Sequence, residues 1–252
     1  MKNSQRNNHA VKIDASGIYY RDLNAQLREL ASNGTRKIEL RNVFGQRYIG
    51  TNLNKPVEID IFGTPGNDLG AFMDGPRLTV HGNAQDGCGN TMNNGEIIVH
   101  GHAGDIIGLS ARGGKIFIRD SIGYRGGIHM KEYQAKKPVL VIGGAAQDFL
   151  GEYMAGGVLV LLGLKGCQFH KTRFIGTGMH GGVIYLRGSI ESHQLGKEVG
   201  TADLAEGDWQ ILKKIIAEFA AHFDYDADEI LNHKFIKLFP LWLRPYGRIY
   251  TG

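Results

Sequence analysis

The chain has 252 residues, of which 42% are hydrophobic and 21% are charged, and its 29 Lys and Arg exceed its 25 Asp and Glu by four. This length and balance predict a soluble globular protein with a sizeable core. The small basic excess is spread along the sequence and does not favour nucleic acid as a partner.

Neither a membrane segment nor an export signal is expected. The longest apolar run, Val158–Leu162, is too short to cross a bilayer. The segment Met1–Asp14 is polar and lacks the apolar stretch of a signal peptide. The two cysteines, Cys88 and Cys167, are too few to form an iron–sulfur or structural zinc site by themselves. We therefore expect a cytoplasmic protein with reduced thiols.

The first predicted element is a helix over 20–34. Leu23, Leu27 and Leu30 recur at helical spacing, and Asn33 with Gly34 is typical of a C-terminal stop. Residues 1–36 are therefore predicted to be a lead-in with a capping helix, ahead of a first repeat unit at 37–50.

A glycine repeat follows this helix. The 37 glycines are close to 15% of the 252 residues, against about 7% in an average protein. A constant step (82 − 63 = 19) relates Gly63, Gly82 and Gly101, and also Gly70, Gly89, Gly108 and Gly127; after a short insertion near 131–137 the pattern resumes with Gly144, Gly151 and Gly163. A second short insertion falls near 165–173. We predict that these ten glycines are structural, at corners where the backbone takes positive φ or packs closely.

Between the glycines, apolar residues alternate at period two. One column holds Leu78, Ile97, Ile116, Leu140, Leu159 and Ile184, and a second holds Val80, Val99, Ile118, Ile142, Leu161 and Leu186. This alternation indicates strands whose two columns face inward. Their neighbours, such as Thr79, Ile98 and Phe117, are predicted to face outward, and we expect Ile98 to tolerate polar substitution.

The repeat unit is too short for a strand and a crossover helix, but it fits a coil of short strands joined by glycine turns. The repeat therefore predicts an all-β fold, a right-handed parallel β-helix of about seven coils over 37–190. Helical caps are expected at both ends, because an open end of a solenoid core exposes apolar surface and strand edges.

Residues 191–252 are predicted to form the C-terminal cap and tail. Asp208 is the expected N-cap of a helix whose apolar stripe runs from Trp209 through Phe219 to Phe223. A short second helix is expected over 226–233. The tail, 235–252, is aromatic, and a docking surface for a partner is the alternative to capping.

Several motifs could carry chemistry, but each has a structural interpretation that we favour. The G-x-G-x-x-G at 176–181 leads into another strand, whereas a dinucleotide loop opens a helix. Stacked Asn67, Asp86, Asp105 and Asp148 could bind a cation, although turn residues of this type usually bond to backbone. His81 and His100 stack on an outer strand without a convergent ligand set. Cys88 falls in a core column with Ile107.

The sequence resembles the GXGXG domain at the C-terminus of the glutamate synthase large subunit. The resemblance covers nearly the whole chain and rests on the glycine pattern and on three segments: 14–24 (DASGIYYRDLN), 42–50 (NVFGQRYIG) and 243–251 (LRPYGRIYT). The same domain occurs in one of the chains of formylmethanofuran dehydrogenase, in formyltransferase/hydrolase complexes and in one of the chains of N-methylglutamate synthase.

The resemblance implies a structural subunit of a split glutamate synthase in the cytoplasm. In that family a glutamine amidotransferase releases ammonia, a flavin- and iron–sulfur-containing chain uses it to aminate 2-oxoglutarate, and the β-helix supplies no catalytic residue. Accordingly no catalytic, cofactor-binding or metal-binding residue is assigned here. The expected partners are those two chains, with contact at Arg47, Tyr48, Trp242 and Tyr246; neither nucleic acid nor membrane is expected, and a homo-oligomer is left open.

Two other interpretations stay open. The chain could serve one of the related complexes named above. It could also be an independent β-helix that binds or cleaves carbohydrate, because enzymes of that class place acids on such a surface.

Overall fold

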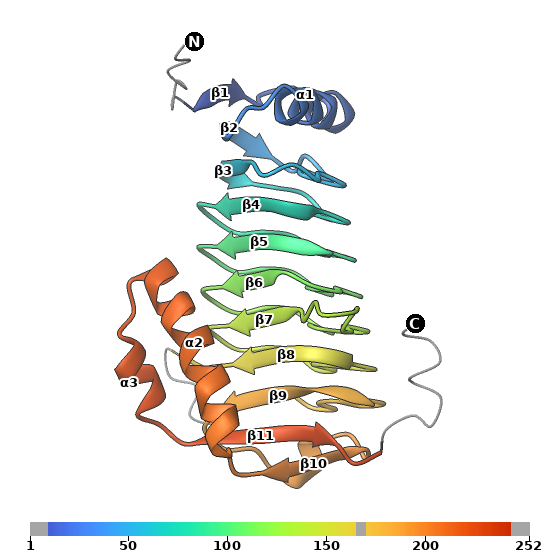
Figure 1. Cartoon of the computed structure of the whole chain (residues 1–252), viewed down its shortest axis with the longest axis vertical. Coiled ribbons are helices and arrows are strands. Elements are labelled where there is room, and N and C mark those ends of the chain that lie inside the picture. Colours follow the sequence, from blue (N-terminus) through green and yellow to red (C-terminus); the bar gives the residue numbers. More distant parts are fainter. Residues whose placement is uncertain (1–9, 165–169, 243–252) are drawn as a thin grey trace, which may run out of the picture.

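The computed structural model describes residues 10–164 and 170–242, whose strands stack into one elongated sheet (Figure 1). Its elements are β1 (Val11–Asp14), α1 (Tyr20–Ser32), β2 (Lys37–Phe44), β3 (Glu58–Thr64), β4 (Asp74–Val80), β5 (Asn94–Val99), β6 (Lys115–Ile118), β7 (Val139–Ile142), β8 (Ala155–Leu161), β9 (Gly181–Arg187), the 3-10 helix η1 (Ser192–Gln194), β10 (Val199–Ala202), α2 (Glu206–Phe223), α3 (Ala227–Leu231) and β11 (Phe235–Pro240). Strands β1 to β9 pair in chain order, all parallel, and the predicted parallel β-helix is confirmed.

The coil length agrees with the glycine period. The register places Glu58 beside Arg77, Arg77 beside Glu96, and Glu96 beside Lys115, so these coils advance along the sequence in equal steps that match the spacing of the glycines. Longer steps separate β6 from β7, where Lys115 pairs with Val139, and β8 from β9, where Val158 pairs with Val183. The two insertions are thereby confirmed, the second lying partly outside the described residues.

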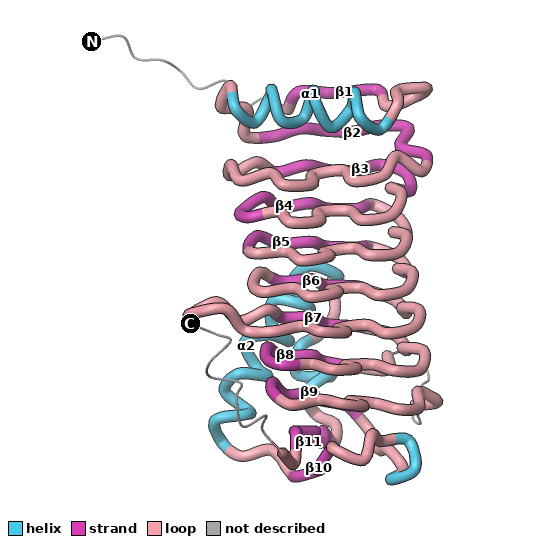
Figure 2. The backbone as a smooth tube through the Cα atoms, turned by 90° about the vertical axis from the view of Figure 1, so that its right-hand side faces the viewer, coloured by secondary structure: helices cyan, strands magenta, loops and turns pink. Residues whose placement is uncertain are grey.

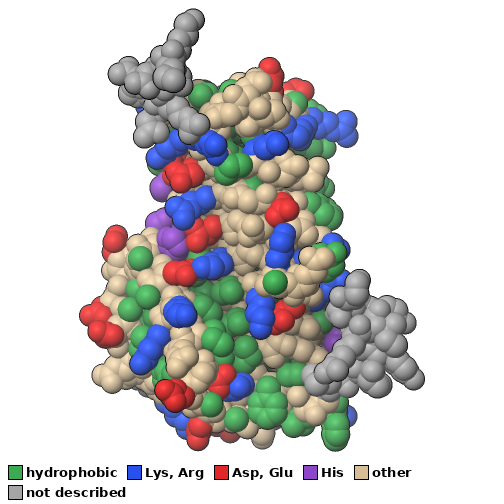
Figure 3. Space-filling view, in the orientation of Figure 1, with side chains coloured by type: hydrophobic (Ala, Val, Ile, Leu, Met, Phe, Trp, Pro, Cys, Tyr) green, Lys and Arg blue, Asp and Glu red, His purple; other side chains and the backbone are tan. Residues whose placement is uncertain are grey.

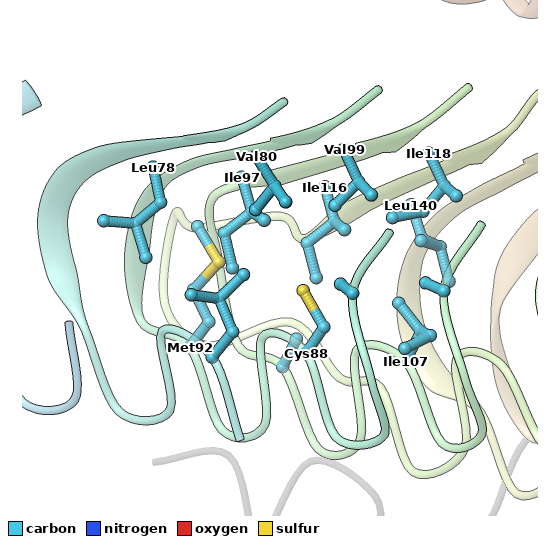
Figure 4. Close-up of a cluster of buried hydrophobic side chains, with 14 of the residues drawn as sticks. Leu78, Val80, Cys88, Met92, Ile97, Val99, Ile107, Ile116, Ile118 and Leu140 are labelled. Carbon is cyan, nitrogen blue, oxygen red and sulfur yellow. The ribbon is translucent and has the colours of Figure 1, made fainter. Parts of the chain in front are cut away.

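Both predicted inward columns form the core of the solenoid. Register pairs Leu78 with Ile97 and Val80 with Val99, and both ladders continue to β9. Their side chains are buried in one cluster that also contains Cys88, opposite the sheet (Figure 4). The core is thus a stack of equivalent apolar side chains, in which each coil covers the one before.

Glycine is required at the corners for two reasons. Seven of the ten predicted glycines have positive φ, a conformation that costs residues with a Cβ: Gly63, Gly70, Gly89, Gly108, Gly127, Gly151 and Gly163. At Gly101, one of the other three, the limit is space, because a Cβ would lie 2.7 Å from the carbonyl oxygen of Gly82 in the preceding coil.

The outer face of the sheet divides into a charged half and an apolar half. On β2 to β4 its residues include Lys37, Glu58 and Arg77, whereas from β5 to β9 they are mostly apolar, with Glu96 and Lys115 as the charged exceptions. Helix α2 lies against the apolar half (Figure 1). There it buries a second cluster that includes Ile98 and Phe117. Ile98 faces outward as predicted but is only 4% exposed, so the expectation that it tolerates polar residues is wrong.

The two ends are closed differently. At the N-terminal end α1 lies level with β1 and buries Leu23 and Leu27 in the main core, as predicted (Figure 2). At the other end β11 pairs antiparallel with β9 and with β10, so part of the predicted tail is a strand. Helix α2 covers the side of the sheet. No helix in the described part of the chain is long and apolar enough to cross a membrane.

The C-terminal helices begin close to their predicted starts, with one correction. Helix α2 has Ala205 as its N-cap, and Asp208, the predicted cap, lies one turn into it. There the Asp208 carboxylate accepts a hydrogen bond from the Ala205 backbone N–H at 3.0 Å. Helix α3 has Asp226 as its N-cap, whose side chain accepts from the N–H groups of Asp228 and Glu229.

Candidate functional site: an apolar groove beside the sheet

The stacked carboxylates bond to the backbone of the next coil. Asp86 Oδ1 accepts from the Asp105 N–H at 2.9 Å, and Asp105 Oδ1 accepts from the Tyr124 N–H at 2.8 Å. Asp148 accepts from the Arg173 N–H and also binds its guanidinium at 2.7 Å. These acids therefore tie successive coils together, which is the structural interpretation favoured for turn residues of this type.

The stacked histidines also have local partners. The rings of His81 and His100 stack with centroids 5.5 Å apart, and His81 Nε2 lies 3.0 Å from Asp60 Oδ1. Burial, and then the neighbouring His81, lower the pKa of His100, which keeps that ring neutral at neutral pH. Within residues 10–164 and 170–242, no group of three or more His, Cys, Asp or Glu side chains could hold a metal ion.

Cys88 and the G-x-G-x-x-G segment also belong to the scaffold. Cys88 is fully buried beside Ile107, and burial raises the pKa of its thiol to about 12, so it is a poor nucleophile at neutral pH. Gly176 and Gly178 have positive φ in a turn, and Gly181 begins β9. Since a strand follows the glycines, no helix N-terminus is available there for a phosphate.

An open and mainly apolar groove lies between α2 and the starts of the strands. Its volume is about 1120 Å³. We call it the α2 groove; its apolar lining is Val139, Val158, Val183, Ile211, Ile215, Phe239, Pro240 and Leu241. Figure 3 shows hydrophobic side chains gathered beside α2, on the lower half of the face. Ile211 is 45% exposed and Leu241 is 48% exposed, so one side of the second core is open to solvent.

A polar cluster lies at the base of this groove. The Tyr185 hydroxyl donates to Asp208 Oδ1 at 2.7 Å, and Lys237 Nζ donates to Asp208 Oδ2 at 3.0 Å. Burial, and then the bond to Asp208, raise the pKa of Tyr185, so the phenol stays protonated. Every member has a partner within the cluster, which joins α2 to β9 and β11. The cluster anchors the helix.

The family can now be assigned from the glycine-rich solenoid and from sequence comparison. A family model of the GXGXG motif matches residues 23–242. The chain belongs to the GXGXG-motif family.

Comparison with known proteins gives one relative in sequence and one in structure. An uncharacterized protein from Methanocaldococcus jannaschii, MJ1350, is 51% identical over 251 residues, which is 96% of each chain. A chain of the formyltransferase/hydrolase complex FhcABCD from Methylorubrum extorquens, solved with methylofuran, aligns over 90% of each chain with a TM-score of 0.56 at 16% identity. At that identity the second relative shows a shared fold alone.

Of the predicted partner-contact residues, Arg47 and Tyr48 lie at the opposite end of the GXGXG solenoid from Trp242. Tyr48 is 38% exposed and its ring lies 5.8 Å from that of Tyr20, while Arg47 is exposed nearby. Trp242, beyond β11, is 72% exposed. Tyr246 lies outside the described residues. Among the described residues, the predicted contacts are therefore not brought together.

Sequence reasoning missed two surface features. Phe44, on β2, is 91% exposed and lines an open cavity of about 810 Å³ beside Tyr19 and Tyr20. The α2 groove was also missed, although the outward column of the GXGXG repeat carries a signal for it. That column becomes apolar from Ile98 onward, and a solvated strand face would stay polar.

Proposed function

We propose that this chain is a non-catalytic scaffold subunit of a split, cytoplasmic glutamate synthase-type complex, with a glutamine amidotransferase chain and a flavin- and iron–sulfur-containing synthase chain as its partners. The observation that carries the proposal is that the two most exposed large hydrophobic side chains of the described residues lie near opposite ends of a rod. Phe44 is 91% exposed on β2 and Trp242 is 72% exposed after β11. Exposed aromatic residues are enriched where proteins bind one another.

The geometry suits a spacer between two chains. Eight strand spacings separate β2 from β11, or roughly 38 Å at about 4.8 Å per spacing. A continuous packed core resists bending along this length. The rod could therefore hold two catalytic chains at a set separation, with the first in contact with Arg47 and Tyr48 and the second with Trp242 and Tyr246.

A second candidate function rests on the solved relative. The fold shared with a chain of a formyltransferase/hydrolase complex supports a scaffold role in a complex of that kind. Both candidates are structural roles, and they differ in the identity of the partners. In either case residues 1–36 form the proposed N-terminal cap, 37–190 the GXGXG solenoid and 191–252 the C-terminal region.

Co-purification distinguishes the two candidates. This chain, carrying an affinity tag, is expressed with the amidotransferase and synthase chains of the same genome, and separately with the formyltransferase/hydrolase chains. We expect the first pair to be retained in a fixed ratio. Retention of the second set alone would overturn the glutamate synthase assignment, and retention of neither set would overturn the scaffold role.

Two exposed residues test the contact surfaces within this experiment. Phe44→Ser is expected to release one partner and Trp242→Ser the other. Gln85→Ser, at an exposed position on an intermediate coil, serves as the matched control and should release neither. Loss of both partners from a single variant would contradict a rod with one partner at each end.

A further inference from the structure

The second core of the molecule is covered on one side only. Helix α2 packs on Phe117 and on Tyr185, but Val139 and Val183 are only partly buried at its margin. Next to them the Ile211 side chain, on α2, lines the α2 groove and is 45% exposed. An apolar floor of this kind is stabilised by a further apolar segment, because its side chains still contact water.

The charged side chains around the groove do not favour a charged occupant. Lys115 pairs with Glu218 at one end, and Lys137 lies 3.8 Å from Glu132 along one side. At the base Lys237 pairs with Asp208. Since most rim charges already face a partner, the segment that fits best is an apolar one with few charges of its own.

A candidate segment follows β11 in this chain and starts next to the groove. Strand β11 ends at Pro240, and both Pro240 and Leu241 line the groove. Ten residues, 243–252, follow in the sequence: LRPYGRIYTG. They include the apolar or aromatic residues Leu243, Tyr246, Ile249 and Tyr250, and their charged side chains are Arg244 and Arg248.

The length of this segment is sufficient. The groove runs from β11 to β6, four strand spacings or about 19 Å. An extended chain covers about 3.3 Å per residue, so roughly six residues span the groove and ten exceed its length. The segment starts at the groove, so loop closure costs little entropy.

We propose that the α2 groove is the binding site of this chain's own C-terminal segment, residues 243–252. Bound there, the segment covers Ile211 and Val183 and completes the second core. It also holds the chain beyond Trp242 in one conformation, which lowers the entropy cost for any partner that binds it. The inference does not depend on the proposed function.

Trypsin cleavage of the full-length protein tests this inference. Trypsin cuts after Lys and Arg but poorly before Pro, so within the segment the bond between Arg248 and Ile249 is the usable site. The rate at which the last four residues are lost is measured by mass spectrometry and compared with the rate for a synthetic 241–252 peptide. We expect cleavage in the protein to be at least about tenfold slower, because an occupied groove withholds the segment from the protease.

A matched pair of variants on α2 locates the protection. Ile211→Asp places a charge on the groove wall and is expected to restore cleavage to near the peptide rate. Gln210→Asp, an adjacent exposed position outside the lining, should leave the segment protected. Circular dichroism checks that both variants keep the fold, which is expected because Ile211 is already 45% exposed.

Three results would overturn the inference. Cleavage of the wild-type protein at the peptide rate would show that the segment is free. Protection that disappears on dilution would assign the groove to a second copy of the chain. Protection that appears only when an amidotransferase or synthase chain is added would assign the segment to that partner. The comparison of wild-type protein with peptide does not rely on any variant.

Discussion

At the scale of single residues, each coil depends on glycines at its corners and on apolar side chains between them. Both sets could be predicted from the sequence, because each recurs at a fixed interval and the repeat averages out local exceptions. The repeat does not show whether a given glycine is required because its φ is positive or because a Cβ would have no space. Gly63 is limited by both: its φ is +124°, and a Cβ there would lie 2.1 Å from the Val43 carbonyl oxygen.

The first prediction compares two Gly→Ala substitutions. Gly63→Ala should lower the free energy of unfolding by about 2 kcal/mol or more, since both the backbone conformation and the neighbouring carbonyl oppose a methyl group. Gly207→Ala, on α2 with no atom within 4 Å of the added Cβ, should be neutral or stabilising by up to about 1 kcal/mol. Urea denaturation measures both. Equal effects would contradict the account of the corners.

The second prediction concerns the two faces of β5. Val99→Asp should destabilise the protein by at least about 3 kcal/mol, because it buries a carboxyl in an apolar ladder. Ile98→Asp should also be strongly destabilising, because α2 covers Ile98. Gln85→Asp, at an exposed position, should change stability by less than about 0.5 kcal/mol. Tolerance of Asp at position 98 would mean that α2 does not pack there.

At the scale of elements, the position of α2 is what sequence analysis could not supply. Its helical stripe was recognisable from Trp209 to Phe223, but a stripe does not say which surface it covers. The outward ladder does contain the answer, because it changes from charged residues to Phe117 and Val141. The apolar stripe of α2 and the apolar part of the outward ladder are separate patterns in the sequence, and only the tertiary structure shows that they pack against each other. The groove beside α2 was missed for the same reason.

The anchor of α2 gives a pH-dependent prediction. Although burial alone would raise the pKa of Asp208, the hydrogen bonds from Lys237, from Tyr185 and from the Ala205 N–H hold it below its usual value. A depressed pKa stabilises the fold fully above about pH 4, the pKa of an unfolded Asp, and this contribution is lost as pH falls toward the folded pKa. The loss of stability caused by Asp208→Asn should therefore be larger at pH 7 than at pH 3.

Denaturation of the wild-type protein and of Asp208→Asn at the two pH values measures that difference. Gln210→Asn, at an exposed position on α2, is the control and should show little dependence on pH, because neither side chain titrates. A stability difference for Asp208→Asn that grows as pH falls would contradict the assigned direction of the pKa shift.

At the scale of the whole molecule, the chain is a rod whose main core is continuous along the coils. The two most exposed large hydrophobic side chains of its described residues, Phe44 and Trp242, lie near opposite ends. The rod could be predicted from the repeat, and the family assignment agrees with it. The partner surfaces could be predicted only as single residues, because Phe44 and the α2 groove depend on which side chains the fold leaves uncovered. A scaffold role follows from this shape if two partner chains must stay at a set distance.

One measurement tests that role most directly: glutamate formation by the amidotransferase and synthase chains, with and without this chain, supplied with either glutamine or free ammonia. A scaffold holds the two catalytic chains in a set geometry, so ammonia released at one site reaches the other before it escapes. We predict that omission of this chain strongly reduces the glutamine-dependent rate and leaves the ammonia-dependent rate nearly unchanged. A glutamine-dependent rate that is unaffected by omission would contradict the account.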